Sequence, residues 1–172
     1  MKIVTIHTKH GWLAAGWSIE GLRGLVLPQK SYEKALEKLA VRLQAESLTM
    51  HIFEQLRSDE KKLIQDIERY FRGEVVSFTA KIDWAGYTPF QQRVLSVVQQ
   101  IKYGKVSSYK QVAIKAGFPK AARAVGGVMR SNRTPLVIPC HRVLASDGSL
   151  GGFSDGLELK KDLLKLEMIP AF

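Results

Sequence analysis

A long segment without acidic residues constrains the fold of this chain more than any other feature of its sequence. Residues 85–145 contain no aspartate or glutamate, but ten lysines and arginines are spread along them. The net charge of +10 therefore comes from this segment, since the remaining 16 basic residues balance the 16 acidic ones. Such side chains reach either solvent or a negatively charged partner. The bias favours nucleic acid over a merely solvated basic surface.

The bulk composition narrows the class of protein. A chain of 172 residues can bury a core as one domain or as two small ones. No apolar run approaches the ~20 residues of a membrane span, and the first residues lack the pattern of a signal peptide. The single cysteine excludes an internal disulfide and suits a reducing compartment, and the four histidines show no ligand spacing for a metal. We therefore expect a cytoplasmic protein, without membrane contact and without a metal.

The first half of the chain, residues 1–82, predicts an α+β domain with a small antiparallel sheet. Ser31 is the expected N-cap of a helix that runs to about residue 46, and Ser58 caps a second helix that stops at Gly73. No polar residues converge here, so we interpret this half as scaffold. The expected strands are residues 3–6, 12–15, 25–27 and 75–82.

The second half, residues 83–172, predicts a mainly helical domain. Thr88 caps a helix from Pro89 to about Ile101, and Ser108 with Gln111 forms a capping box for a helix over residues 109–116. After Gly117, Pro119 is expected to open a helix to about Arg130. Two short helices joined by a glycine-containing turn are typical of a helix-turn-helix motif. A last helix is expected over residues 157–168.

The second helix of this pair has an unusual composition. Alanines at 121, 122 and 124 surround Arg123, so one long side chain projects from a smooth patch. Such a patch allows the backbone to approach another surface closely. Alanine is also simply a good helix former, so ordinary helix packing remains an alternative.

The chemistry of the chain centres on Cys140, which is followed directly by His141. A thiol becomes a good nucleophile only beside a base or in a cationic setting, and a third group usually orients the base. Neighbouring side chains on a strand point to opposite faces, so adjacency alone does not pair them. A buried, inert cysteine is the alternative. The acids that follow in sequence are Asp147, Asp155, Glu158, Asp162 and Glu167.

The run Pro139-Cys140-His141-Arg142-Val143 resembles the active-site signature of the O6-alkylguanine-DNA alkyltransferases, or methylated-DNA–protein-cysteine methyltransferases. Further motifs of residues 84–168 are similar to that family in order and spacing, and the first half matches loosely, best at 70–73. Two positions depart from the family pattern. Phe153 stands where many relatives have a tyrosine, and Asp155 stands where some relatives have a glycine. The other similar motifs are 88–91, 108–109, 121–126, 129–132 and 151–154.

The resemblance implies a monomer with a ribonuclease H-like first domain and a helix-turn-helix in the second, without cofactor. Its partner would be double-stranded DNA with alkylated bases, bound in the minor groove, in the cytoplasm or a eukaryotic nucleus. It would flip O6-alkylguanine, and O4-alkylthymine, out of the duplex and move the alkyl group irreversibly onto Cys140. The alternative is a non-catalytic binder of the alkyltransferase-like type, which lacks the cysteine. A transcription regulator has less support, because Arg123 among alanines offers little readout of base edges. A thiol hydrolase has less support, because it would need turnover, and the sequence indicates no second site that would release a thioether.

The resemblance also assigns roles by matching positions. Cys140 attacks the alkyl carbon, His141 takes the thiol proton through a water, and Glu167 orients the imidazole. Tyr109 donates to a guanine ring nitrogen, and Asn132 braces the active-site turn. The expected base contacts are Val143, Phe153, Ser154, Met129 and Pro135. The expected DNA contacts are Arg123, which fills the space of the flipped base, with Ala122, Ala124, Tyr109, Lys120 and Arg130.

Overall fold

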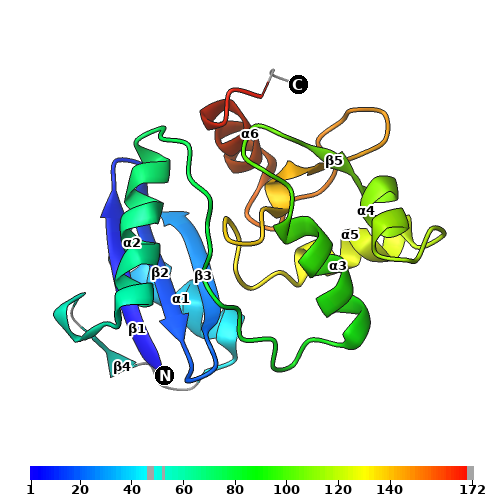
Figure 1. The fold of residues 1–172 in the computed structure, drawn as a ribbon. Coiled ribbons are helices and arrows are strands. Elements are labelled where there is room, and N and C mark those ends of the chain that lie inside the picture. The colour runs from blue at the N-terminus through cyan, green and yellow to red at the C-terminus, as the bar shows by residue number, and fades with distance from the viewer. Residues whose placement is uncertain (46–48, 52, 170–172) are drawn as a thin grey trace. The chain divides into compact units, whose positions relative to one another are not determined.

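The computed structural model of the protein describes residues 1–45, 49–51 and 53–169, and the chain divides into two compact units. One unit contains residues 1–84 together with 133–135, and the other contains the rest. Figure 1 follows the helices and strands along the chain. No helix in the described ranges is both long enough and apolar enough to cross a membrane.

The first unit is built on a four-stranded sheet with the order β3-β2-β1-β4. Three of the four predicted strands are confirmed as β1 (Lys2–Thr8), β2 (Gly11–Trp17) and β3 (Leu22–Gln29), which pair antiparallel. The predicted small antiparallel sheet is thus confirmed, and the short strand β4 (Thr49–Met50) extends it by pairing parallel to β1. A short 3-10 turn, η1 (Phe53–Gln55), follows it.

Helix α1 (Tyr32–Leu43) packs closely on this sheet because glycines leave room for it. A side chain at Gly24 would bring its Cβ within 2.7 Å of Leu43, and one at Gly16 within 3.1 Å of Leu43. The predicted cap is confirmed, since the Ser31 side chain accepts from the Lys34 backbone N–H. The helix ends earlier than expected, because Gln44 adopts a left-handed φ of 52°. The expected end at residue 46 lies outside the described residues.

Helix α2 (Ser58–Phe71) begins one residue earlier than the sequence suggests. Ser58 is its first residue rather than its cap, which corrects that prediction. The cap is Arg57, whose backbone N–H donates to the Glu60 carboxylate over 2.8 Å. The Glu60 carboxylate, three residues further on, therefore accepts from a backbone N–H at the start of the helix. Figure 1 shows α2 lying across the sheet, and it contacts β1.

The strand expected over residues 75–82 is wrong. Only Ile82 pairs with a neighbour, in an isolated bridge to Leu22. The alternating pattern nevertheless has a physical cause, because Val76 and Ile82 are buried and Val75 is 68% exposed. An extended segment that packs one face on the core produces the same alternation as a strand, without a ladder of backbone hydrogen bonds.

Three helices form the centre of the second unit: α3 (Pro89–Gln99), α4 (Tyr109–Lys115) and α5 (Ala122–Arg130). The predicted cap at Thr88 and the predicted capping box at Ser108 are confirmed, and Thr88 also forms a capping box, with Gln91. Pro119 does not open α5, which corrects that expectation. The Ala121 N–H donates to the Phe118 carbonyl over 2.9 Å, so the proline lies in a turn before the helix.

The remaining elements bring distant segments of this unit together. β5 (Ser107–Ser108) pairs in parallel with β6 (Val143–Leu144), and between α5 and β6 lies the 3-10 turn η2 (Cys140–Arg142). Helix α6 (Leu157–Leu166) contacts η2. It stops before the expected residue 168, because Met168 adopts a left-handed φ of 55°.

Candidate active site

Cys140 is the first residue of η2 and is only 5% exposed. Because this segment is a tight turn rather than a strand, Cys140 and His141 do not alternate between two faces of a sheet. The Asn132 side-chain amide donates to the Ile138 carbonyl over 2.8 Å and lies 3.2 Å from the Cys140 sulfur. It therefore braces the turn that carries the thiol.

His141 and Glu167 form a buried pair, with 2.8 Å between Nε2 and Oε1. Burial lowers the pKa of His141 although Glu167 acts in the opposite direction, so the imidazole is neutral near pH 7. Because an ionised carboxylate can only accept, we assign the ring hydrogen to Nε2. Nδ1 is buried and has no hydrogen-bond partner in the described part of the chain. Its lone pair is therefore the basic position of the ring.

Glu167 is held ionised by several donors. Arg142 donates from Nε to Oε2 and from Nη2 to Oε1, each over 2.9 Å, and the Gly104 backbone N–H donates to Oε2 over 3.2 Å. Burial alone would raise the pKa of Glu167, but the hydrogen bonds from His141 and Arg142 lower it to about 2. We did not predict Arg142 as a site residue, although it follows His141 directly in the motif.

Lys160 is a second buried charge that the sequence did not lead us to expect. Its side chain is fully buried on α6, and Nζ donates to the Val143 carbonyl over 2.6 Å and to the Leu150 carbonyl over 2.5 Å. Burial lowers its pKa to about 8, and the nearby Cys140 partly opposes this shift. Its spacing could have indicated that it is buried, because Lys160 lies three and four residues before the buried Leu163 and Leu164 and so shares their face of the helix.

Tyr109 at the start of α4 lies against the loop around Gly151. Its hydroxyl donates to the Gly152 carbonyl over 3.3 Å. Gly151 has a φ of +65°, and a Cβ there would come within 2.8 Å of the Tyr109 ring and hydroxyl. Burial raises the pKa of Tyr109, and Cys140 raises it further, so the phenol stays protonated beside the thiol.

A cavity of about 340 Å³ lies between Tyr109, helix α5 and the loop of residues 145–152. Arg123 and Arg130 project from α5 at this cavity, both exposed, and no acidic side chain lines it within the described ranges. Lys110, which we did not predict, joins them. Of the other expected DNA contacts, Ala122 lines the cavity, whereas Ala124 and Lys120 are exposed outside it.

The expected base contacts are less closely gathered. Met129 is buried on α5, and Phe153 is half-buried with its ring centre 5.9 Å from the Lys160 Nζ. Ser154 is exposed, and its hydroxyl donates to Asp155 over 3.4 Å. Pro135 is buried, but it belongs to the first unit, whereas the other expected base contacts belong to the second.

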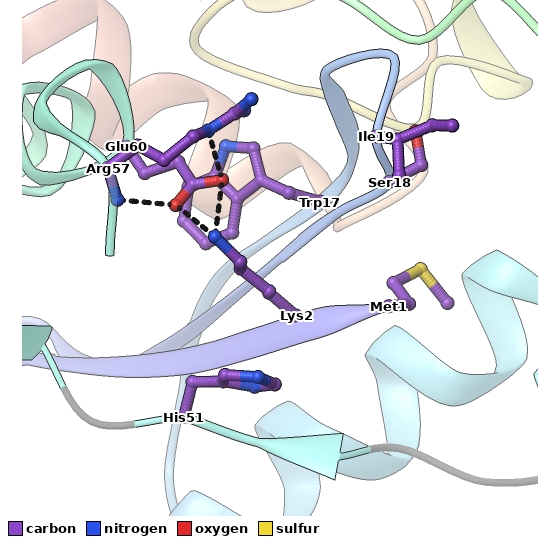
Figure 2. Close-up of a pocket in the computed structure, with 8 residues that line it drawn as sticks. All are labelled: Met1, Lys2, Trp17, Ser18, Ile19, His51, Arg57 and Glu60. Carbon is purple, nitrogen blue, oxygen red and sulfur yellow. Dashed lines mark hydrogen bonds and ion pairs between the residues drawn. The ribbon is translucent and has the colours of Figure 1, made fainter. Parts of the chain in front are cut away.

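A separate cavity of about 550 Å³ lies within the first unit (Figure 2). Lys2 and Arg57 point at the buried Glu60 carboxylate, at 3.1 Å and 3.0 Å, beside Trp17. Burial raises the pKa of Glu60, but the Arg57 backbone N–H and Lys2 outweigh it, and the net shift is downward. This carboxylate is already neutralised, so the cavity offers no evident chemistry. Within the described ranges, no three histidine, cysteine or acidic side chains gather as a metal site.

Comparison with known proteins identifies the relatives of the chain. Residues 89–169 match the family model described as the DNA-binding domain of 6-O-methylguanine DNA methyltransferase. A methylated-DNA–protein-cysteine methyltransferase of Haemophilus influenzae is 38% identical over 152 residues, or 81% of this chain and 85% of that protein. One of the same name from Methanosarcina barkeri is 42% identical over 107 residues, or 62% of this chain and 67% of that protein.

The fold is similar to solved structures as well. Mycobacterium tuberculosis OGT, crystallised in complex with DNA, has a TM-score of 0.76 and 31% identity, over 97% of this chain and 92% of that one. An O6-methylguanine-DNA methyltransferase of Pyrococcus kodakaraensis has a TM-score of 0.71 and 25% identity, over 98% and 99% of the two chains. Since the match with the Haemophilus protein spans most of both sequences, the chain belongs to the methylated-DNA–protein-cysteine methyltransferase family.

Proposed function

We propose that this protein repairs DNA by moving the alkyl group of O6-alkylguanine, and of O4-alkylthymine, onto the sulfur of Cys140. The observation that carries the proposal is the buried His141–Glu167 pair directly after Cys140 in a chain of this family, and we call these three residues the relay. The relay contains a nucleophile, a neutral base and a group that orients the base, which together satisfy the requirements of nucleophilic catalysis.

The proton inventory of the transfer follows from the side chains. His141 takes the thiol proton at Nδ1 through a bridging water, and the resulting imidazolium is stabilised by the Glu167 carboxylate. The thiolate attacks the alkyl carbon, a carbon–sulfur bond forms, and the carbon–oxygen bond to the base breaks. The electron pair of that bond passes into the base. The Tyr109 phenol, which burial keeps protonated, then donates a hydrogen bond to a ring nitrogen, so the base does not leave as a bare anion.

We infer that the cavity beside α5 receives the DNA. In this proposal α4 and α5 act as a helix-turn-helix that enters the minor groove, and the ribonuclease H-like first domain of residues 1–82 serves as scaffold for the domain of residues 83–172. The exposed Arg123 occupies the space of the flipped base, and the small Ala122 and Ala124 let the helix approach. Lys120 and Arg130 contact phosphates. Val143, Phe153, Ser154, Met129 and Pro135 surround the base.

The protein acts once, as a monomer, and needs no cofactor in this proposal. In this proposal the thioether formed on Cys140 is not cleaved again, so the cysteine is consumed as a co-substrate. We place the reaction in the compartment that holds DNA, which is the cytoplasm in prokaryotes. The non-catalytic, alkyltransferase-like alternative is not favoured, because Cys140 is present and the buried His141–Glu167 pair follows it.

The proposal is tested by separating chemistry from binding. Cys140→Ala should abolish transfer of a labelled methyl group to the protein while DNA binding is largely kept. Arg123→Ala should slow repair in duplex DNA more than reaction with free O6-benzylguanine, since the free base requires no flipping. Residual labelling of the alanine variant, or equal losses on both substrates for the arginine variant, would contradict these roles.

A further inference from the structure

A second basic cavity lies in the second unit, and none of the residues that line it has been assigned a role in the reaction. It has a volume of about 540 Å³ and is lined by Lys102, Lys105 and Lys115, with Val97 and Val106 among its walls. All three lysines are exposed, and no aspartate or glutamate lines the cavity in the ranges that the structure describes. Three cations therefore share one hollow without a neutralising acid.

The loop that carries two of these lysines is firmly anchored to the buried relay. The Gly104 backbone N–H donates to Glu167 over 3.2 Å, and the Tyr103 hydroxyl donates to the Leu166 carbonyl over 2.9 Å. The Lys105 N–H donates back to the Lys102 carbonyl over 3.1 Å, which closes a turn. The backbone positions of both lysines are thus fixed, which lowers the entropic cost of binding a ligand between them.

The charge balance of the cavity favours an anion. The carboxyl-terminal ends of α3 and α4 border it, and each contributes about half a negative charge. Three lysines outweigh these two partial charges and leave roughly two net positive charges. Lys115 also stabilises the end of its own helix, but that role needs only one cation and does not explain Lys102 and Lys105.

We propose that this cavity binds backbone phosphates of the same DNA duplex, outside the segment that holds the extrahelical base. The shared element is α4, which contributes Lys115 here and Tyr109 and Lys110 to the cavity beside α5. A polyanion that engages one side of this helix therefore has further phosphates available for the other. This site rests on the proposed function, because it presumes that DNA is bound beside α5.

The test removes the three charges together. We would compare Lys102→Gln/Lys105→Gln/Lys115→Gln with a control of equal charge, Lys9→Gln/Lys30→Gln/Lys34→Gln, whose exposed lysines lie in the first unit. Binding of both to a long duplex with O6-methylguanine is measured between 50 and 200 mM salt. The cavity variant should flatten the log–log salt slope by about 0.9 for each lost phosphate contact, up to three contacts. The control should keep the wild-type slope.

Two further measurements make the outcomes distinct. Both variants should react with free O6-benzylguanine at the wild-type rate, which shows that the relay is intact. A cavity variant whose salt slope equals that of the control overturns the phosphate site. Methyl transfer by the wild-type protein is followed in the same samples, and its absence would instead refute the proposed function. Lys115→Glu alone should weaken binding more than Lys115→Gln, and equal affinities would also count against the site.

Discussion

The substitution Glu167→Gln tests the buried relay most severely, because it changes one atom type and keeps the shape. The two carboxylate oxygens of Glu167 receive donors on both sides. Oε1 faces His141 Nε2 and Arg142 Nη2, and Oε2 faces Arg142 Nε and the Gly104 N–H. A glutamine offers only one oxygen to these positions, so its amide nitrogen must replace an acceptor at one of them.

Either orientation of the glutamine damages the site. With its nitrogen toward Arg142 and Gly104, donors face donors, and the buried guanidinium loses its counter-charge. With its nitrogen toward His141, the imidazole must accept at Nε2 and therefore carries its hydrogen on Nδ1. That tautomer has no lone pair at Nδ1 to receive the thiol proton. Loss of general-base assistance is expected to slow alkyl transfer about 10²-fold to 10⁴-fold.

The cost in stability follows from the pKa of Glu167. A shift from 4.5 to about 2 corresponds to about 3 kcal/mol of preferential stabilisation of the carboxylate in the folded state. This agrees with the 3–5 kcal/mol that is typical of breaking a buried ion pair from one side. We therefore expect Glu167→Gln to lower the free energy of unfolding by about 3 kcal/mol, measured by urea titration.

The assay is a single-turnover reaction with duplex DNA that contains O6-methylguanine. Glu158→Gln is the matched control, in the first turn of the helix that Glu167 follows, because the Glu158 side chain is 87% exposed and forms its ion pair with Lys161 at the surface. It should keep the wild-type transfer rate and change stability by less than about 0.5 kcal/mol. A Glu167→Gln protein that transfers methyl groups at the wild-type rate would refute the role of the relay.

Three further predictions follow from the same contacts. Gly151→Ala should slow transfer and destabilise the protein by about 1 kcal/mol or more, because the new methyl group meets Tyr109 at 2.8 Å in a left-handed backbone conformation; wild-type rate and stability would contradict this. Lys160→Met should slow transfer, since the Val143 and Leu150 carbonyls lose their common donor, whereas Lys161→Met on the exposed face should not; equal rates for both variants would argue against a positioning role. Since the folded-state pKa of Glu167 is depressed to about 2, its stabilisation is complete above pH 4.5 and is lost as the pH falls toward 2; acid unfolding curves of wild type and Glu167→Gln should therefore converge in this window, and a constant difference would exclude the ion pair.

The local elements were predictable because their signals act over a few residues. Thr88 and Ser108 each satisfy orphan N–H groups of the next helical turn, so the starts of α3 and α4 can be read from the sequence. The strand expected at 75–82 failed because alternation reports which side chains are buried. It does not report whether the backbone finds a partner strand.

The active site was predictable only in part, for a reason that lies in its charges. The sequence alone left five acids as candidates to orient His141, and only the family resemblance selected Glu167. Arg142 and Lys160 escaped prediction because lysine and arginine are normally placed on the surface. Here each is buried because it satisfies acceptors that the fold brings together, and no local pattern encodes that arrangement.

The central claim, that Cys140 is consumed as an acceptor of the alkyl group, is tested most directly by mass spectrometry of the intact protein after incubation with O6-methylguanine DNA. We predict a gain of one methyl group per molecule, located on Cys140 by peptide fragmentation, that does not increase with excess DNA. Loss of the methyl group from DNA without a lasting gain on the protein, or a gain on another residue, would contradict the account.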